Sequence, residues 1–389
     1  MARDVSVRSL MEAAATRAGT DDWGDLGFTR QLDLLVEGCR STAELTTSGW
    51  DVLRRTVLRH LANRLSLQRQ FSSHAGPVRL PARPVFVTGL PRTGTTLLHN
   101  LLAQDDELRI LRLWEALRPA PPSAAGSVER ADAERALVRQ AETWLERTYT
   151  MVPGLQAIHP ATAEGPEECD VLLQNSFASL HFDDMWNAEL YSAWFAAADL
   201  HEEYRYYARQ LALLMGTDDA PRRWLLKSPG HLGHLDALLA AFPDALIVQC
   251  HRHPAQAVGS WASLVRAVRA PHTDRLNLAV VGRQALSRAW RASERAMQLR
   301  NGTGSQVFVD VSYERLVATP AMVVEDVYAR LGRPLNPPAQ GRMRRWLGDN
   351  MQYAHGRHNY GLDEFGLHAD EVVERFAPYL ERFGDLVEA

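Results

Sequence analysis

The segment GLPRTGTT, at residues 89–96, has the composition of a loop that binds an anion. It follows PVFVTG (84–89), a short apolar run rich in β-branched residues, and it precedes a helical pattern that begins at Thr95. In such a loop, backbone N–H groups and the start of the helix together attract phosphate or sulfate. These residues therefore predict a phosphate-binding loop between a buried strand and a helix.

The loop differs from the nucleoside triphosphatase pattern, G-x-x-x-x-G-K-[ST], at one important position. Gly89 and Gly94 match the two glycines, and Thr96 fills the last position, but Thr95 stands in place of the lysine. Because that lysine contacts the β- and γ-phosphates, its replacement argues against triphosphate hydrolysis. Arg92, two residues before the second glycine, supplies a cation at a different point of the loop.

Lysine is almost absent from this sequence. Of 43 basic residues, Lys227 is the only lysine, and the other 42 are arginine. Lysine carries a compact point charge, whereas the guanidinium group of arginine is a wide planar fork. A chain that uses arginine elsewhere is expected to keep a lysine where the fork does not fit, and chance retention is the alternative.

The order of motifs along the chain resembles that of the sulfotransferases that use 3′-phosphoadenosine 5′-phosphosulfate (PAPS), in their bacterial and tyrosylprotein-type branch. PRTGTT is similar to their 5′-phosphosulfate loop. WLLKSPGHLGHLDALLAAFPDALIVQCHRHPAQAVGS (224–260) is similar to their lysine–serine–proline turn and the helix and strand that follow. VSYERLVATP (311–320) and HGRHNYGLDEFGL (355–367) resemble two later segments, of which the second closes over the nucleotide.

The resemblance implies PAPS as the co-substrate, without a metal, and it assigns roles around the phosphate loop. Backbone N–H groups and hydroxyls of the loop are expected to hold the 5′-phosphate; the residues are Thr93, Gly94, Thr95 and Thr96. Arg92 is expected to pair with that phosphate or with the sulfate. In sulfuryl transfer, as in phosphoryl transfer, the protein has to align the groups and stabilise charge on the leaving phosphate.

Residues further along the chain complete the site that the resemblance implies. Lys227 is expected to reach the oxygen that bridges phosphate and sulfate, where negative charge develops. Arg252 follows the strand ALIVQC, and Ser260 lies about two helical turns beyond it, so both side chains can converge on the 3′-phosphate at the edge of the sheet. Tyr313 and Arg357, in the two later segments, are expected to contact the nucleotide.

Two residues compete for the role of general base toward the acceptor. Relatives with a PRSGTT-like loop place a glutamate after the next short strand, which corresponds to Glu115. Cytosolic relatives use a histidine near the lysine turn, which corresponds to His231. The carboxylates of PEECD (166–170) are interpreted as the acidic start of a helix, where the helix dipole favours negative charge, and contact with the acceptor stays open.

The elements that position these residues alternate between strands and helices. Helical stretches separate the strand-like apolar runs 84–89, 109–113, 224–227, 245–250 and 306–311. This alternation predicts an α/β fold with a P-loop-like parallel β-sheet flanked by helices. Residues 1–80 are expected to form an N-terminal helical region, and residues 81–389 a sulfotransferase-like domain with a helical, aromatic-rich acceptor-site insertion at about 118–222.

The composition of the 389-residue chain indicates a soluble globular protein. It is 46% hydrophobic, has three scattered cysteines and carries a net charge of −4, which gives no general affinity for nucleic acid. We find no signal peptide or membrane span in the sequence and expect a cytoplasmic location. The expected partner is a small-molecule or lipid-like acceptor with a hydroxyl or amine. A homodimer stays open, because the N-terminal helices can dock on their own subunit or on a second copy.

Two other functions stay open on the sequence alone. An ATP-dependent small-molecule kinase with a P-loop core needs the missing lysine and an acidic magnesium ligand, for which Asp310 is the one candidate. An inactive nucleotide-binding scaffold is expected to lose its basic groups, yet Arg92, Lys227 and Arg252 are all present.

Overall fold

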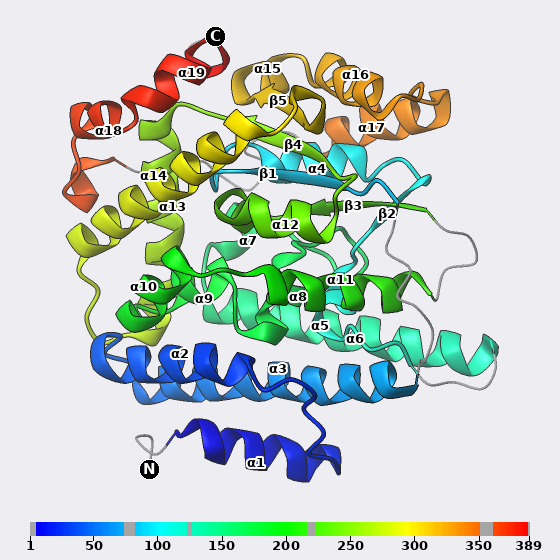
Figure 1. Ribbon diagram of the computed structural model, residues 1–389, viewed down its shortest axis with the longest axis vertical. Helices are drawn as coiled ribbons and strands as arrows, with labels where there is room; N and C mark the ends of the chain where they lie inside the picture. The colour runs from blue at the N-terminus through cyan, green and yellow to red at the C-terminus, as the bar shows by residue number, and fades with distance from the viewer. Residues whose placement is uncertain (1–4, 74–81, 123–126, 217–221, 351–360, 388–389) are drawn as a thin grey trace.

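The computed structural model describes residues 5–73, 82–122, 127–216, 222–350 and 361–387 (Figure 1). One sheet of five parallel strands has the order β2-β3-β1-β4-β5. The strands are β1 (Val85–Gly89), β2 (Leu108–Ile110), β3 (Arg223–Lys227), β4 (Leu246–His251) and β5 (Phe308–Ser312). Helices lie on both faces, so the predicted parallel sheet flanked by helices is confirmed.

Two strands are shorter than the apolar runs that predicted them. β2 ends at Ile110, because the chain turns into the short helix α5 (Leu113–Leu117) directly afterwards. β5 begins at Phe308, because residues 305–307 form a turn of 3₁₀-helix. Neither difference moves the carboxyl ends of the central strands, where Val87 of β1 pairs with Lys227 of β3 and Gly89 pairs with Cys250 of β4.

Alternate residues of the strands face two separate layers of helices. Val85, Val87 and Leu225 pack with α4 (Thr95–Leu102), α16 (Pro320–Leu331) and α17 (Pro337–Asp349) on one face. Phe86 and Leu226 belong to the larger core on the other face. The helices that contribute to this larger core include α12 (Leu235–Ala241), α13 (Pro254–Arg269), α14 (Leu278–Gly302), α18 (Ala369–Arg375) and α19 (Ala377–Val387). The short helix α15 (Tyr313–Ala318) directly follows β5.

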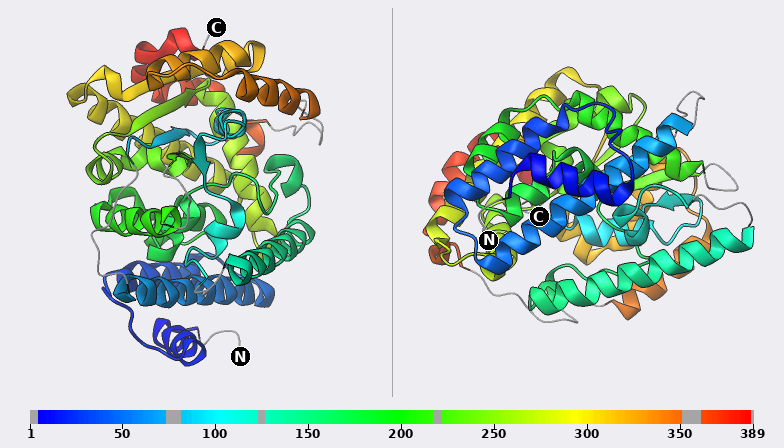
Figure 2. Two further views of the ribbon diagram at one scale, coloured as in Figure 1. Left: turned by 90° about the vertical axis from the view of Figure 1, so that its right-hand side faces the viewer. Right: turned by 90° about the horizontal axis from the view of Figure 1, so that it is seen from below.

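The helices of the predicted insertion lie between the sheet and the N-terminal helices (Figures 1 and 2). The N-terminal helices are α1 (Val7–Ala18), α2 (Phe28–Thr42) and α3 (Thr47–Ser73). The insertion holds α6 (Ser127–Met151), α7 (Leu155–Ile158), α8 (Asp170–Leu173), α9 (Leu180–Met185), α10 (Glu189–Ala197) and α11 (His201–Met215). Residues of all three N-terminal helices share one hydrophobic core with the insertion. Many of its aromatic side chains are part of that core, among them Phe177, Phe182, Trp186, Tyr191, Tyr204 and Tyr207.

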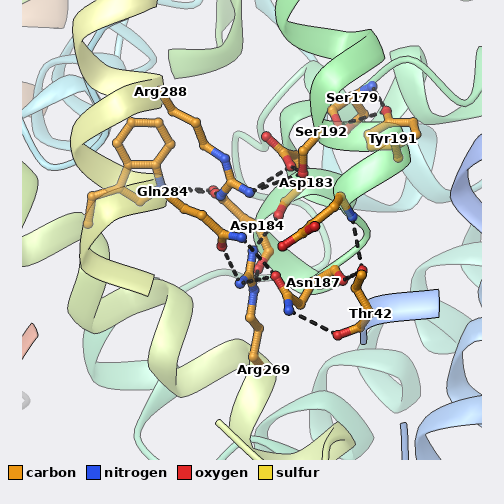
Figure 3. Close-up of polar contacts among 12 residues, drawn as sticks. Thr42, Ser179, Asp183, Asp184, Asn187, Tyr191, Ser192, Arg269, Gln284 and Arg288 are labelled. Carbon is orange, nitrogen blue, oxygen red and sulfur yellow. Dashed lines mark hydrogen bonds and ion pairs between the residues drawn. The ribbon is translucent and has the colours of Figure 1, made fainter. Parts of the chain in front are cut away.

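A polar cluster joins α9 to α13 and α14 (Figure 3). Arg269 is buried and donates to the backbone oxygens of Asp183 and Asp184, at 2.8 and 2.9 Å. Arg288 forms ion pairs with the carboxylates of the same two residues, at 2.7 and 3.2 Å. Nearby, Asn187 donates to the backbone oxygen of Thr42 at 3.0 Å and so ties the end of α2 to the insertion.

Candidate active site

The loop from β1 to α4 has the backbone of an anion-binding loop. Gly89 has φ 146°, and a Cβ there would lie 2.4 Å from the backbone oxygen of Cys250. Gly94 has φ 89°, and a Cβ there would lie 3.0 Å from the ring of Tyr313. Gly94 also precedes the first turn of α4, and no side chain caps that turn. The positive φ and close contacts at Gly89 and Gly94 favour glycine at both positions, and the first N–H groups of α4 have no side-chain cap, as in helix starts that bind oxyanions.

Lys227 joins this loop to a carboxylate of the insertion. It ends β3 next to β1 and is only 1% exposed. Its Nζ lies 3.3 Å from Thr96 Oγ1, in the first turn of α4, and 2.6 Å from Glu168 Oε1. A compact ammonium group, itself buried, thus contacts both the phosphate loop and an acid that is partly exposed.

A second group of cations and polar residues lies at the carboxyl end of β4. Arg92, with φ 71°, donates through Nε to Ser260 Oγ at 3.1 Å. Arg252 donates to the backbone oxygen of Arg92 at 3.0 Å, and its guanidinium lies 4.2 Å from the centre of the Tyr313 ring. The structure therefore brings Arg252 and Ser260, the predicted pair for the 3′-phosphate, close to Arg92 of the loop and to Tyr313.

The comparisons with known proteins identify the family. The model of the sulfotransferase family matches residues 84–337, more than half of the chain. The chain belongs to the sulfotransferase family. The sulfotransferase STF1 from Mycobacterium tuberculosis H37Rv is 33% identical, with a TM-score of 0.83 over 96% of this chain and 99% of its own. The sulfotransferase STF9 from Mycobacterium avium is 28% identical, with a TM-score of 0.84 over 98% of this chain and 97% of its own. No curated protein sequence gives a significant match.

The carboxylates of residues 166–170 in this sulfotransferase differ in their surroundings. Glu167 and Glu168 precede α8, which begins at Asp170, so neither lies in the first helical turn. Burial raises the pKa of Glu167, but the charge and hydrogen bond of His159 and the charge of Lys227 outweigh it and lower the pKa to about 2. Burial raises the pKa of Asp170 to about 7. Glu168 is the one that contacts Lys227, with 28% of its side chain exposed.

Glu115, one of the two predicted bases, lies in a structural ion pair. It is 3% exposed, and its two oxygens accept hydrogen bonds from the guanidinium of Arg109, at 2.8 Å for Oε2. The backbone N–H of Arg112 also donates to Oε2, at 2.9 Å. This carboxylate caps α5 and neutralises Arg109, and the structure does not bring it to Lys227.

His231, the other predicted base, lies in the hydrophobic core. Its Nδ1 lies 2.7 Å from the hydroxyl of Tyr204, and its Nε2 lies 3.1 Å from Cys169 Sγ. Its ring packs edge-on against Phe86, and burial lowers its pKa to about 3. Because it is fully buried and both ring nitrogens have partners, its position does not favour the expected contact with an acceptor.

The predicted loop residues do not all present their side chains to a ligand. Thr93 is buried and donates its hydroxyl to the backbone oxygen of Leu90 at 2.7 Å, so it holds the loop in shape. Thr95 is 3% exposed, whereas Thr96 is partly exposed and contacts Lys227. Arg357 lies outside the described residues.

The surroundings of Asp310 do not favour it as the magnesium ligand that a kinase would need. Asp310 lies 2.7 Å from Arg300 and 2.8 Å from His251 Nε2, and these contacts lower its pKa although burial raises it. It therefore serves as an ion-pair partner on β5. Within the described ranges, no group of three or more histidine, cysteine, aspartate or glutamate side chains could hold a metal ion. In the same ranges, no helix has the length and apolar character needed to cross a bilayer.

Proposed function

We propose that this sulfotransferase moves a sulfuryl group from PAPS to a hydroxyl of a small-molecule or lipid-like acceptor. The observation that carries the proposal is the position of the Lys227 ammonium group, which contacts the phosphate loop at Thr96 and the carboxylate of Glu168. These two contacts support a role for Lys227 as the donor to a leaving phosphate and for Glu168 as the acceptor of a proton.

The residues around the loop fit a nucleotide with phosphates at both ends of its ribose. The N–H groups at the start of α4 and the Arg92 side chain suit a 5′-phosphosulfate. Arg252 and Ser260, which lie against Arg92, suit the 3′-phosphate. The ring of Tyr313 lies against Gly94 of the loop and beside the guanidinium of Arg252, which suits the expected contact of Tyr313 with the nucleotide. PAPS supplies an activated sulfuryl group and a phosphate as the leaving group.

Lys227 and Glu168 are expected to divide the chemistry between them. The Lys227 ammonium stabilises negative charge on the leaving oxygen. Glu168 Oε1 accepts from Lys227, and among the described residues none donates a hydrogen bond to Oε2, which we propose takes the proton of the acceptor hydroxyl. We therefore propose Glu168 as the general base in place of Glu115 and His231.

Two matched variants test the choice of base. Glu168→Gln keeps the shape of the side chain and removes the proton acceptor, so transfer of radiolabelled sulfate from PAPS to a panel of phenols and alcohols should collapse. Calorimetry should still show binding of adenosine 3′,5′-bisphosphate. Glu115→Gln, the control, should retain transfer. A Glu168→Gln enzyme that works at the wild-type rate would exclude Glu168 as the base.

The choice of nucleotide needs its own experiment. Adenosine 3′,5′-bisphosphate should raise the melting temperature of the protein, and Arg252→Ala should abolish that increase. ATP with magnesium should have a smaller effect, because the loop lacks the triphosphatase lysine. Equal stabilisation by both nucleotides would count against PAPS as the donor.

A further inference from the structure

His159 and Glu167 form an ion pair that the proposed division of the chemistry leaves unused. His159 Nε2 lies 3.2 Å from Glu167 Oε1, and the exposed fractions of the two side chains are 33% and 9%. The same Oε1 accepts from the backbone N–H of Glu168 at 2.7 Å. One carboxylate oxygen therefore holds the imidazole ring against the segment that carries the proposed base.

Direct contacts connect this pair to both sides of the proposed reaction centre. Ile158, the residue before His159, accepts through its backbone oxygen from Nη1 of Arg92, at 3.1 Å. Glu168, the residue after the carboxylate of the pair, contacts Lys227 Nζ at 2.6 Å. The ion pair therefore lies between the arginine of the phosphate loop and the contact of the lysine with the proposed base, next to each of them in the chain.

Hydrogen bonds fix the backbone of His159 on both sides of its side chain. Its N–H donates to the backbone oxygen of Leu155 at 2.7 Å, at the end of α7. Its own backbone oxygen accepts from the hydroxyl of Tyr149, in α6, at 3.1 Å. The ring is thus held by its backbone and by Glu167, while its other nitrogen, Nδ1, forms no hydrogen bond with any residue that the structure describes.

The surroundings of His159 favour its charged form. Burial lowers its pKa, but the charge and hydrogen bond of Glu167 outweigh burial and raise the pKa above its usual value, with Lys227 acting against the charge and Glu168 for it. In the described ranges, burial lowers the pKa of His60, His99, His181, His231, His234, His251 and His272. An imidazolium that donates from Nε2 to Glu167 carries a second N–H at Nδ1, which a neutral ring in the same contact does not have.

We propose that His159 donates from Nδ1 to an oxygen of the sulfuryl group of PAPS, with Glu167 holding the ring in position. This inference rests on the proposed function and adds a catalytic residue to it. As the sulfuryl group is transferred, the bond from sulfur to the phosphate oxygen breaks, a bond from sulfur to the acceptor oxygen forms, and the acceptor proton goes to Glu168. His159 keeps both of its protons and stabilises the negative charge on the outer sulfuryl oxygens.

Two nucleotides that differ by the sulfuryl group isolate this contact. Calorimetry without acceptor, at about pH 6, where a histidine with a raised pKa carries its proton, measures binding of PAPS and of adenosine 3′,5′-bisphosphate. His159→Gln should weaken the binding of PAPS about tenfold to a hundredfold, the range that a hydrogen bond to a charged group supplies. Its affinity for the bisphosphate should stay nearly unchanged. An equal loss for both nucleotides, or no loss for PAPS, overturns the proposal.

Further variants separate a contact with the sulfuryl group from a general effect on the fold. His201→Gln is the matched control, because His201 is 37% exposed and pairs with Asp199 at the start of α11, and it should change neither affinity. His159→Arg restores a cation and should recover part of the affinity for PAPS. His159→Asn, a smaller replacement, repeats the comparison of the two nucleotides. Circular dichroism verifies that each variant is folded.

Sulfate transfer distinguishes failure of this inference from failure of the proposed function. Selective loss of PAPS binding in His159→Gln supports the contact even if wild type transfers no sulfate to any phenol or alcohol, and that combination refutes the proposed function alone. If wild type transfers sulfate and folded His159→Gln binds PAPS and transfers at the same rate, the proposed function stands and the His159 contact is refuted. A wild-type protein that binds neither nucleotide refutes both.

Discussion

Replacement of Lys227 by methionine separates the effect of its charge on stability from its effect on chemistry. The ammonium lies 2.6 Å from Glu168, and the exposed fractions of the two side chains are 2% and 28%. Removing one partner of a fully buried ion pair costs about 3–5 kcal/mol. Because more than a quarter of the Glu168 side chain reaches solvent, we expect Lys227→Met to lower the free energy of unfolding by less, about 1–3 kcal/mol.

The double variant Lys227→Met/Glu168→Gln reveals where this cost comes from. It removes both charges, so no unpaired carboxylate is left, and the free energy of unfolding should return to within about 1 kcal/mol of wild type. Sulfate transfer should not return, because the proposed donor to the leaving phosphate and the proposed proton acceptor are both missing. Loss of one such donor alone slows the chemical step about 100-fold.

Two assays are needed on the wild type, on Lys227→Met and on the double variant. Urea unfolding followed by tryptophan fluorescence gives the free energy of unfolding, and single-turnover transfer of radiolabelled sulfate from PAPS gives the rate of the chemical step. The reasoning is refuted if Lys227→Met keeps a rate within about tenfold of wild type. It is also refuted if the double variant regains its rate together with its stability.

Three further predictions follow from the same contacts. Lys227→Arg keeps the charge but places a wider group in a site that is 1% exposed, so kcat should fall about 100-fold, while calorimetry should show little change in affinity for adenosine 3′,5′-bisphosphate. Glu115→Gln breaks the ion pair with Arg109 and should lower the urea midpoint without loss of turnover. His231 has a pKa lowered to about 3 by burial, so it gains a proton on unfolding once the pH falls below about 6.5. Stability should therefore decrease from pH 7 to pH 4, and less steeply in His231→Asn.

The sequence was sufficient to predict the sheet and the proximity of Arg252 and Ser260 at the end of β4. The strand, loop and helix around Gly94 are consecutive in the chain, so their patterns describe the structure directly. Arg252 directly follows β4, and Ser260 lies in the next helix, α13. The geometry of that helix fixes the separation of the two residues. Such local relations carry no information about the segments that fold over them from elsewhere.

The contact between Lys227 and Glu168 depends on one of those distant segments. Residues 166–169 lie along the ends of two strands, where the N–H of Glu167 donates to Leu111 and the N–H of Cys169 donates to Lys227. No periodicity or spacing in the sequence predicts that the segment docks there. The partner of Glu115 was missed for a different reason: its ion pair with Arg109 forms across the turn from β2 into α5, where the sequence predicted a continuous strand over residues 109–113.

The single lysine of the chain has a physical explanation in this arrangement. Arg92 donates in two directions, from Nε to Ser260 and from Nη1 to the backbone oxygen of Ile158, and only a forked side chain can do so. At Lys227, by contrast, one donor group has to contact Thr96 and Glu168 from a closed space at the end of β3. A guanidinium would spread the same charge over a wider plane. The preference for arginine along the rest of the chain therefore stops at the residue where a point charge is needed.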